Sequence, residues 1–307
     1  MAITPQLDAV KQMFTSMGER SQELGTVDGS RLALEELMAQ FPLDDDVVYE
    51  PINAGGVAAE WISINGPREK TGGEATIEPV ILYLHGGGYV IGSVRSYRGF
   101  LSRMSRAADA RVLGLDYRLA PEFPFPAALD DSVAAYRWLL SQGVEPGNIV
   151  IGGDSAGGGL TVSTLVALRY LGEPMPAAGV CISPWVDLEG TGESMISKAE
   201  VDTIVQKEML GFMTQLYMGD RDLRAPLAAP LYADLRGLPP LLIQVGTAET
   251  LLDDSTRLAD RAKSSGVKVE LSIWDDMIHV WPIFAPVLPE GQQAIERIGE
   301  FVRQQAK

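Results

Sequence analysis

Cysteine and histidine are scarce in this sequence. Its 307 residues include one cysteine, Cys181, which excludes a disulfide framework. Cys181 lies in an apolar run, where a cysteine is usually a small buried hydrophobic residue and not a nucleophile. The two histidines are far apart, at positions 85 and 279, and neither H-E-x-x-H nor C-x-x-C occurs. We therefore expect neither a metal site nor a cofactor.

Basic residues are also few compared with acidic ones. The chain has 25 lysines and arginines against 41 aspartates and glutamates, a net charge of −16. This balance argues against nucleic acid or an anionic membrane as the main partner. No apolar run approaches membrane-spanning length, and residues 1–20 lack the apolar core of a signal peptide. We expect a cytoplasmic protein without membrane insertion.

Apolar residues make up 46% of the chain, enough for a sizeable core. Residues 1–45 have two helical patterns, the second with Ser30 as the expected N-cap. Strands then alternate with helices, except in residues 187–230, and residues 65–78 form a polar loop. This order predicts a mostly parallel eight-stranded sheet with an antiparallel start and helices on both faces. The expected strands are 47–52, 57–64, 80–84, 111–116, 148–151, 178–183, 241–245 and 267–274.

Residues 153–157 read G-D-S-A-G, a match to G-x-S-x-G. A bare match is a weak signal, but here an apolar strand precedes it and a helical pattern follows. In that context the motif is a strained turn that exposes the serine hydroxyl, and its glycines allow close backbone approach. Ser155 is the predicted nucleophile. The N–H of Ala156 lies at a helix N-terminus, where negative charge is favoured.

A second glycine motif, His85-Gly86-Gly87-Gly88, follows the strand at 80–84. Glycine N–H groups in such a loop can bind the oxyanion of a tetrahedral intermediate. A phosphate-binding loop is less favoured, because no lysine follows at the spacing of a nucleotide-binding motif. We predict an oxyanion hole made by Gly86, Gly87 and Ala156.

A serine nucleophile needs a general base, and histidine suits neutral pH. His85 precedes the glycines and is interpreted as structural, which leaves His279. The acid should follow the strand at 241–245, since the order serine, acid, histidine is typical of α/β-hydrolases. Glu249 is favoured, with Asp253 as the alternative. Asp253 or Asp254 also suits the N-cap of the following helix.

These motifs together resemble the bacterial hormone-sensitive-lipase-like carboxylesterases, also called family IV, in the subgroup with a G-D-S-A-G elbow. Residues 116–128 and 183–187 are similar to two further segments of that family. The resemblance covers the chain from about residue 45. Two positions differ: Glu249-Thr250-Leu251 stands where the family has Asp-Pro-Leu, and Val280 replaces the usual glycine after the histidine.

The resemblance implies an α/β-hydrolase fold with a helical cap. The cap would consist of residues 1–45 and an insertion at 187–229, and the catalytic domain of residues 46–186 and 230–307. It also implies a possible homodimer. Both cap segments are rich in methionine, a residue that adapts to varied apolar ligands.

The predicted function is a serine carboxylesterase that hydrolyses short- to medium-chain acyl esters of small molecules through an acyl-enzyme. Ser155 would attack the carbonyl, His279 would act as base and then acid, and Glu249 would orient the histidine. An amidase or lactonase on the same triad is an alternative. A non-catalytic ligand-binding member of the fold is less favoured, because such proteins typically lose a triad residue.

Overall fold

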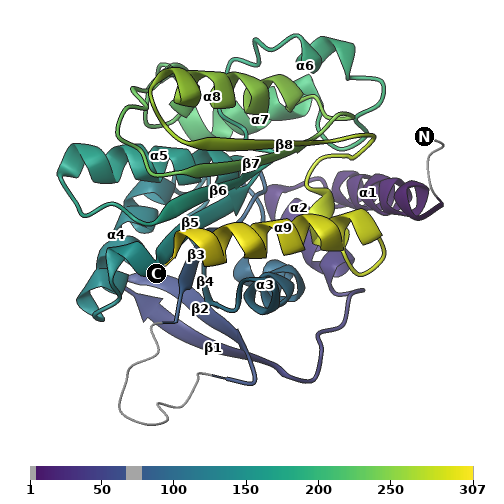
Figure 1. The fold of residues 1–307 in the computed structure, drawn as a ribbon. Helices are drawn as coiled ribbons and strands as arrows, with labels where there is room; N and C mark the ends of the chain where they lie inside the picture. The colour runs from purple at the N-terminus through teal and green to yellow at the C-terminus, as the bar shows by residue number, and fades with distance from the viewer. Residues whose placement is uncertain (1–4, 67–77, 307) are drawn as a thin grey trace.

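An eight-stranded sheet runs through the computed structural model, which describes residues 5–66 and 78–306 (Figure 1). The strand order is β1-β2-β4-β3-β5-β6-β7-β8. β2 is antiparallel to both of its neighbours, and all other pairs are parallel. The predicted fold is confirmed. The strands are β1 (Val47–Ala54), β2 (Val57–Ile64), β3 (Val80–Leu84), β4 (Arg111–Leu115), β5 (Ile149–Asp154), β6 (Ala178–Ile182), β7 (Leu241–Gly246) and β8 (Val269–Trp274).

Helices cover both faces of the sheet (Figure 1). α3 and α9 pack together on one face, while α4, α5 and α8 lie against the other. The α-helices are α1 (Pro5–Leu24), α2 (Val27–Met38), α3 (Val94–Ala108), α4 (Ala127–Ser141), α5 (Ala156–Leu171), α6 (Ser194–Ser197), α7 (Lys207–Met218), α8 (Leu252–Ser264) and α9 (Pro289–Gln305). Short 3₁₀ turns are η1 (Pro146–Asn148), η2 (Pro230–Tyr232) and η3 (Trp281–Phe284).

The central strands divide their side chains between two cores. In β3, Leu82 and Leu84 face the core under α4 and α5, while Ile81 and Tyr83 face the core under α3 and α9. This alternation follows from the two-residue repeat of a strand. Because both faces are covered, β3 is buried along its whole length, which explains why its sequence is continuously apolar.

The start of the second helix differs from the sequence prediction. α2 begins at Val27, and its N-cap is Thr26, whose hydroxyl accepts from the N–H of Gly29 at 3.0 Å. Ser30, the predicted cap, lies inside the first turn. Gly25, with φ of 62°, separates α1 from the cap. Threonine supplies the same capping hydroxyl as serine, so Thr26 can cap the helix as well as Ser30 could.

The polar loop predicted for residues 65–78 falls mostly outside the described residues. In the described part of the chain, none of the helices combines the length and apolarity needed to cross a membrane.

The turn from β5 into α5 packs closely against the end of β3. Ser155 has φ of 52° and ψ of −121°, a conformation that costs energy for any residue with a side chain. A Cβ on Gly157 would lie 1.9 Å from the carbonyl oxygen of Leu84, and one on Gly153 would lie 2.5 Å from the same atom. Only glycine therefore allows α5 to start directly against the end of β3.

We expect Gly157→Ala to lower the free energy of unfolding by at least about 3 kcal/mol, because the new methyl group has no space beside Leu84. Gly147→Ala is the matched control: Gly147 is exposed, and a Cβ added there would meet no heavy atom within 4 Å. Urea unfolding should leave that variant within about 0.5 kcal/mol of the wild type. Equal stability of the two variants would contradict the close-contact argument.

Candidate active site

Three loops at the carboxyl ends of the strands bring the predicted triad residues together. Ser155 follows β5, Glu249 follows β7 and His279 follows β8. The Oγ of Ser155 lies 2.9 Å from Nε2 of His279, and Nδ1 of His279 lies 2.9 Å from Oε2 of Glu249. The three side chains thus form one hydrogen-bonded chain, the arrangement required of a nucleophile, a base and an orienting acid.

Glu249 is fully buried and hydrogen-bonded on both oxygens. Its Oε1 accepts from the N–H of Gly246 at 2.6 Å and from the hydroxyl of Ser183 at 2.9 Å. The oxygen of Ser183 in turn accepts from the N–H of Val280 at 3.2 Å. Ser183 therefore ties the acid loop to the histidine loop. Sequence reasoning assigned it no such role, since the contact spans three separate loops.

The oxyanion loop is held by a buried carboxylate. Oδ1 of Asp154 accepts from the N–H of Gly86 at 3.0 Å and from the hydroxyl of Tyr83 at 2.8 Å, and Oδ2 accepts from the hydroxyl of Tyr97 at 2.8 Å. The N–H of Gly86 is therefore already hydrogen-bonded, to Asp154 and also to the hydroxyl of Tyr97 at 3.1 Å. The sequence prediction counted Gly86 among the oxyanion donors, whereas in this structure its N–H is not free. Asp154 is the variable residue before Ser155 in the elbow motif, a position for which the sequence predicted no function.

The next glycines have free N–H groups. Within residues 5–66 and 78–306, no acceptor is hydrogen-bonded to the N–H of Gly87, Gly88 or Ala156. Gly87 and Gly88 have φ of 109° and 62°, which favours glycine at both positions. Ala156 is the first residue of α5, so its N–H has no partner within the helix.

Gly87 and Gly88 border a cavity of about 120 Å³ together with Ser155 and His279. The rest of the lining is mainly apolar and comes largely from α1, α2 and α7, so those helices cover the nucleophile. The cap-side lining includes Phe14, Met17, Leu34, Met38, Met209 and Met213.

Comparison with known proteins places this arrangement in a family. Residues 81–283 match the family described as the alpha/beta hydrolase fold. An acetyl-hydrolase of Streptomyces hygroscopicus is 42% identical over 98% of this chain and 97% of its own length. An esterase of Acinetobacter venetianus is 34% identical over 88% of this chain and 87% of its own.

Solved structures lead to the same family. A crystal structure of an esterase from the bacterial hormone-sensitive lipase family has a TM-score of 0.94 and 56% sequence identity, and the match covers all of both chains. EstE5, solved after soaking with p-nitrophenyl butyrate, has a TM-score of 0.87 and 46% identity over 98% of this chain and 99% of its own. The chain belongs to the bacterial hormone-sensitive lipase family of carboxylesterases. The predicted family and the predicted ester hydrolase are confirmed.

The two sequence departures from this family have local explanations. Glu249 is one methylene longer than the usual aspartate, yet it contacts His279 at ordinary hydrogen-bond distance. Val280 has φ of 51° and ψ of 33°, the left-handed region that a glycine adopts without strain. Val280 therefore adopts a conformation that is unfavourable for a β-branched residue and that the family's usual glycine would adopt more easily.

Burial and charge act in opposite directions on His279. Burial lowers its pKa, but the hydrogen bond and the negative charge of Glu249 outweigh burial, so the pKa lies above the ordinary histidine value. Burial likewise raises the pKa of Glu249, and the hydrogen bonds from His279, Gly246 and Ser183 limit that rise. The carboxylate of Glu249 therefore stabilises positive charge on His279.

His85, the other histidine, is not part of this hydrogen-bonded chain. It stacks on Tyr117 with ring centroids 4.3 Å apart, and its Nδ1 lies 2.7 Å from the carbonyl oxygen of Gly86. A carbonyl only accepts, so Nδ1 carries the proton. Burial lowers the pKa of His85 to about 4, which keeps the ring neutral.

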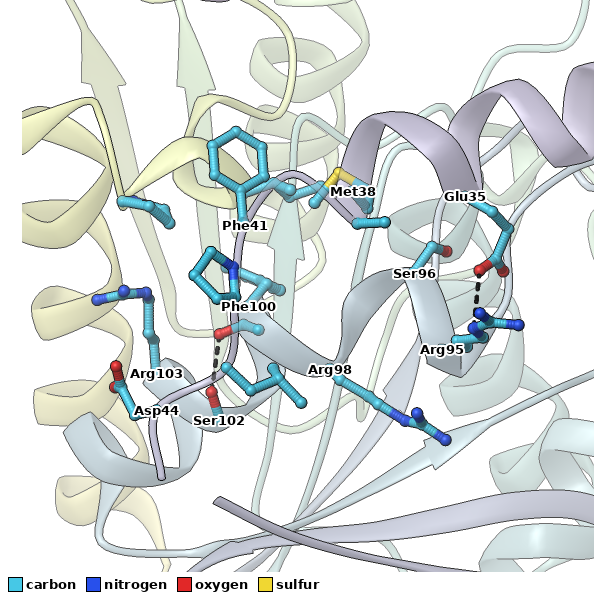
Figure 2. Close-up of a pocket in the computed structure, with 16 residues that line it drawn as sticks. Glu35, Met38, Phe41, Asp44, Arg95, Ser96, Arg98, Phe100, Ser102 and Arg103 are labelled. Carbon is cyan, nitrogen blue, oxygen red and sulfur yellow. Dashed lines mark hydrogen bonds and ion pairs between the residues drawn. The ribbon is translucent and has the colours of Figure 1, made fainter. Parts of the chain in front are cut away.

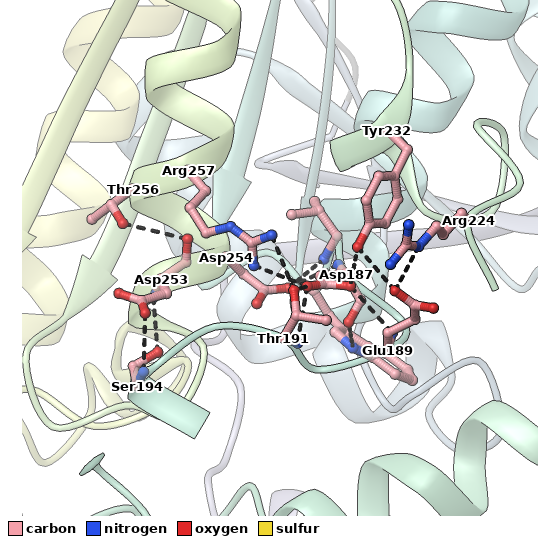
Figure 3. Close-up of polar contacts among 12 residues, drawn as sticks. Asp187, Glu189, Thr191, Ser194, Arg224, Tyr232, Asp253, Asp254, Thr256 and Arg257 are labelled. Atoms are coloured by element: carbon pink, nitrogen blue, oxygen red, sulfur yellow. Dashed lines mark hydrogen bonds and ion pairs between the residues drawn. The ribbon is translucent and has the colours of Figure 1, made fainter. Parts of the chain in front are cut away.

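Asp253, the alternative acid, lies away from His279. Its Oδ2 accepts from the N–H of Ser194 at 3.0 Å (Figure 3). The next residue, Asp254, accepts from the N–H groups of Val186 and Asp187, both at 2.9 Å. The prediction that one of these aspartates caps α8 is wrong, because the cap position is Leu251 and has no side-chain hydrogen bond. Both carboxylates instead accept from backbone N–H groups in the segment from Val186 to Ser194.

A polar cluster around Asp187 strengthens this connection (Figure 3). Asp187 is fully buried, forms an ion pair with Arg257 of α8 at 2.9 Å, and accepts from Thr191 and from the hydroxyl of Tyr232. Burial opposes ionisation of Asp187, but the bonds from Thr191 and Arg257 dominate and lower its pKa. The segment that begins at Asp187 is therefore fixed to α8, close to the loop that carries Glu249.

We expect Asp154→Ala to lower the free energy of unfolding by about 3 kcal/mol, because it leaves the buried hydroxyls of Tyr83 and Tyr97 without their acceptor and removes one of the two acceptors of the Gly86 N–H. Asp45→Ala, at an exposed position, should change it by less than about 0.5 kcal/mol. Denaturant titration of both variants tests this. A loss at Asp154 no larger than at Asp45 would show that the carboxylate does not hold the loop.

Proposed function

We propose that this esterase hydrolyses short- to medium-chain acyl esters through an acyl-enzyme on Ser155. The observation that carries the proposal is the unbroken hydrogen-bonded chain from Ser155 through His279 to Glu249. In this proposal Ser155 attacks the ester carbonyl, and its proton passes to Nε2 of His279. The negative charge of Glu249 stabilises the imidazolium that forms.

The collapse of the first tetrahedral intermediate releases the alcohol, which takes the proton from His279. Water then enters, His279 removes its proton, and attack on the acyl-enzyme returns Ser155 and the carboxylic acid. Both intermediates carry an oxyanion. We assign its donors as the N–H groups of Gly87, Gly88 and Ala156, since these are free where that of Gly86 is bonded to Asp154. Loss of one such donor typically costs about 3–4 kcal/mol of transition-state stabilisation.

We also propose that residues 1–45 and 187–229 form a cap over the catalytic parts 46–186 and 230–307. Helices of both segments line the cavity around Ser155, which supports this division. The cavity's volume of about 120 Å³ favours small acyl groups. The acetyl-hydrolase and EstE5 soaked with p-nitrophenyl butyrate, both similar to this chain, are consistent with that size. The homodimer and the cytoplasmic location stay predictions.

Ser155→Ala should reduce hydrolysis of p-nitrophenyl butyrate by at least about 10⁴-fold, because the acyl-enzyme can no longer form. Ser163→Ala is the matched control, a buried serine of α5 away from the cavity. Circular dichroism confirms that each variant is folded. Full activity of folded Ser155→Ala would refute the assignment of the nucleophile. In the wild type, faster cleavage of a matched anilide than of the ester would favour an amidase instead.

Glu249→Gln should lower kcat by about 10³- to 10⁴-fold, since the amide has no negative charge to stabilise protonated His279. Asp253→Asn should stay within about threefold of the wild type, because that carboxylate contacts only the insertion backbone and not His279. Steady-state kinetics of both variants decides whether Glu249 or Asp253 is the acid of the triad. The reverse order of the two effects would make Asp253 the acid.

The pH dependence of kcat/KM follows from the raised pKa of His279. Only neutral His279 can accept the serine proton, so activity should fall as the pH decreases through a midpoint above about 6.5, the ordinary histidine value. Glu249→Gln removes the stabilisation of the cation and should move this midpoint to lower pH. A wild-type midpoint clearly below that of the variant would contradict the proposed pairing.

A further inference from the structure

A second cavity lies directly behind the catalytic one. It has a volume of about 150 Å³ and is bounded by the end of α2, the segment that follows it, α3 and the region of η3. Figure 2 shows Met38 and Phe41 on one side of this second cavity and Phe100 and Arg103, both of α3, on another. It has no triad residue in its lining.

One layer of side chains separates the two cavities. Met38 and Ile283 line both of them. Consecutive residues of α3 also divide between them, with Ser96 facing the second cavity and Tyr97 the catalytic one. Opening this layer would more than double the space available beside Ser155.

The side chains of Met38 and Ile283, which separate the two cavities, differ in conformational freedom. Ile283 is β-branched and buried in η3, so its rotamer is restricted. Met38 is the last residue of α2 and is only half-buried, with a cavity on each side of its side chain. An unbranched thioether with three rotatable bonds adapts easily to such a position. Met38 is therefore the part of the wall that can move.

The chemistry of the second cavity suits a hydrocarbon chain. Its lining combines apolar side chains, among them Phe41, Phe100 and Ile283, with polar and charged ones. Two of its three arginines are already ion-paired, Arg98 with Glu60 at 2.6 Å and Arg95 with Glu35 at 3.5 Å. The site therefore offers apolar surface and largely compensated charge, which disfavours an anion as its main ligand.

In an acyl-enzyme mechanism the alcohol and the acyl group of the substrate leave the site at different times. The alcohol leaves first, while the acyl chain stays bound to Ser155 until water attacks. The side of the cavity that is closed by Met38 and Ile283 therefore suits the acyl chain, since the alcohol has to leave before the acyl chain does.

We propose that Met38 sets the acyl-chain limit of this enzyme and that the cavity behind it receives the distal end of longer acyl chains when this side chain is displaced. This inference rests on the proposed function. Met38 and Ile283 act here as specificity-determining residues, not as catalytic ones.

The test compares kcat/KM for p-nitrophenyl acetate, butyrate, hexanoate, octanoate and decanoate, each below its critical micelle concentration. Met38→Ala should raise the decanoate-to-butyrate ratio at least about tenfold, since each added methylene now finds apolar space. Met13→Ala is the matched control, because Met13 is also a half-buried cap methionine but lines neither cavity.

A double variant tests the second cavity itself. Gly99 lines that cavity, and a Cβ there would make only an ordinary 3.7 Å contact with Leu43. Gly99→Leu should therefore fold and fill the space, so Met38→Ala/Gly99→Leu should lose the gain for decanoate. Ile283→Ala removes the side chain of the other residue between the two cavities. If Met38→Ala does not fold, the same decanoate-to-butyrate ratio is measured on Ile283→Ala and should rise in the same direction.

An unchanged ratio in folded Met38→Ala that still cleaves butyrate would overturn the inference and leave the proposed function intact. A gain that persists in the double variant would also overturn it, because the chain would then extend elsewhere. Absence of hydrolysis of every ester by the wild type would instead refute the proposed function.

Discussion

The contact between the start of α5 and the end of β3 is the constraint on which the rest of the site depends. Gly157 lies so close to the carbonyl of Leu84 that no side chain fits between them. This contact sets the nucleophile-bearing turn against the loop at residues 85–88, and Tyr117 adds a 2.7 Å hydrogen bond to the carbonyl of His85. The strained backbone of Ser155 is maintained because these rigid elements leave it no relaxed alternative.

Two buried carboxylates then hold the loops that carry the chemistry. Asp154 binds Gly86 and two tyrosines, and burial raises its pKa to about 6. Glu249 binds Gly246, Ser183 and His279. Burying an ionisable group is costly unless its oxygens are satisfied, and here each carboxylate collects three donors. The two buried carboxylates therefore hold the loops that they bind in place, and Glu249 also supplies negative charge beside His279.

The covering helices are attached by polar contacts in the same manner. Arg31 of α2 donates to the carbonyls of Val90 and Ala120 and pairs with Glu122 at 2.8 Å. On the other side, Asp187 and Arg257 secure the start of the insertion. An exposed ion pair contributes little by itself, but bonds to buried carbonyls and a buried carboxylate are stronger. The cavity over Ser155 is thus framed by two segments far apart in sequence, and Met38 closes one side of it.

The sequence by itself determined the sheet, the order of its strands along the chain, and Ser155, Glu249 and His279 as a set. These depend on local patterns: apolar runs that alternate with helices, a glycine-flanked serine, and the presence of only two histidines. The choice of Glu249 over Asp253 was made from loop position, and the structure has Glu249 beside His279. Only the tertiary structure decided which acceptor the N–H of Gly86 binds, and that Met38 lines two cavities. The hydrogen-bond partners of Asp154, Ser183, Asp253 and Asp254 were likewise decided by the tertiary structure. Each of these features depends on side chains or backbone groups from separate loops that meet after folding, and no local pattern encodes such a meeting.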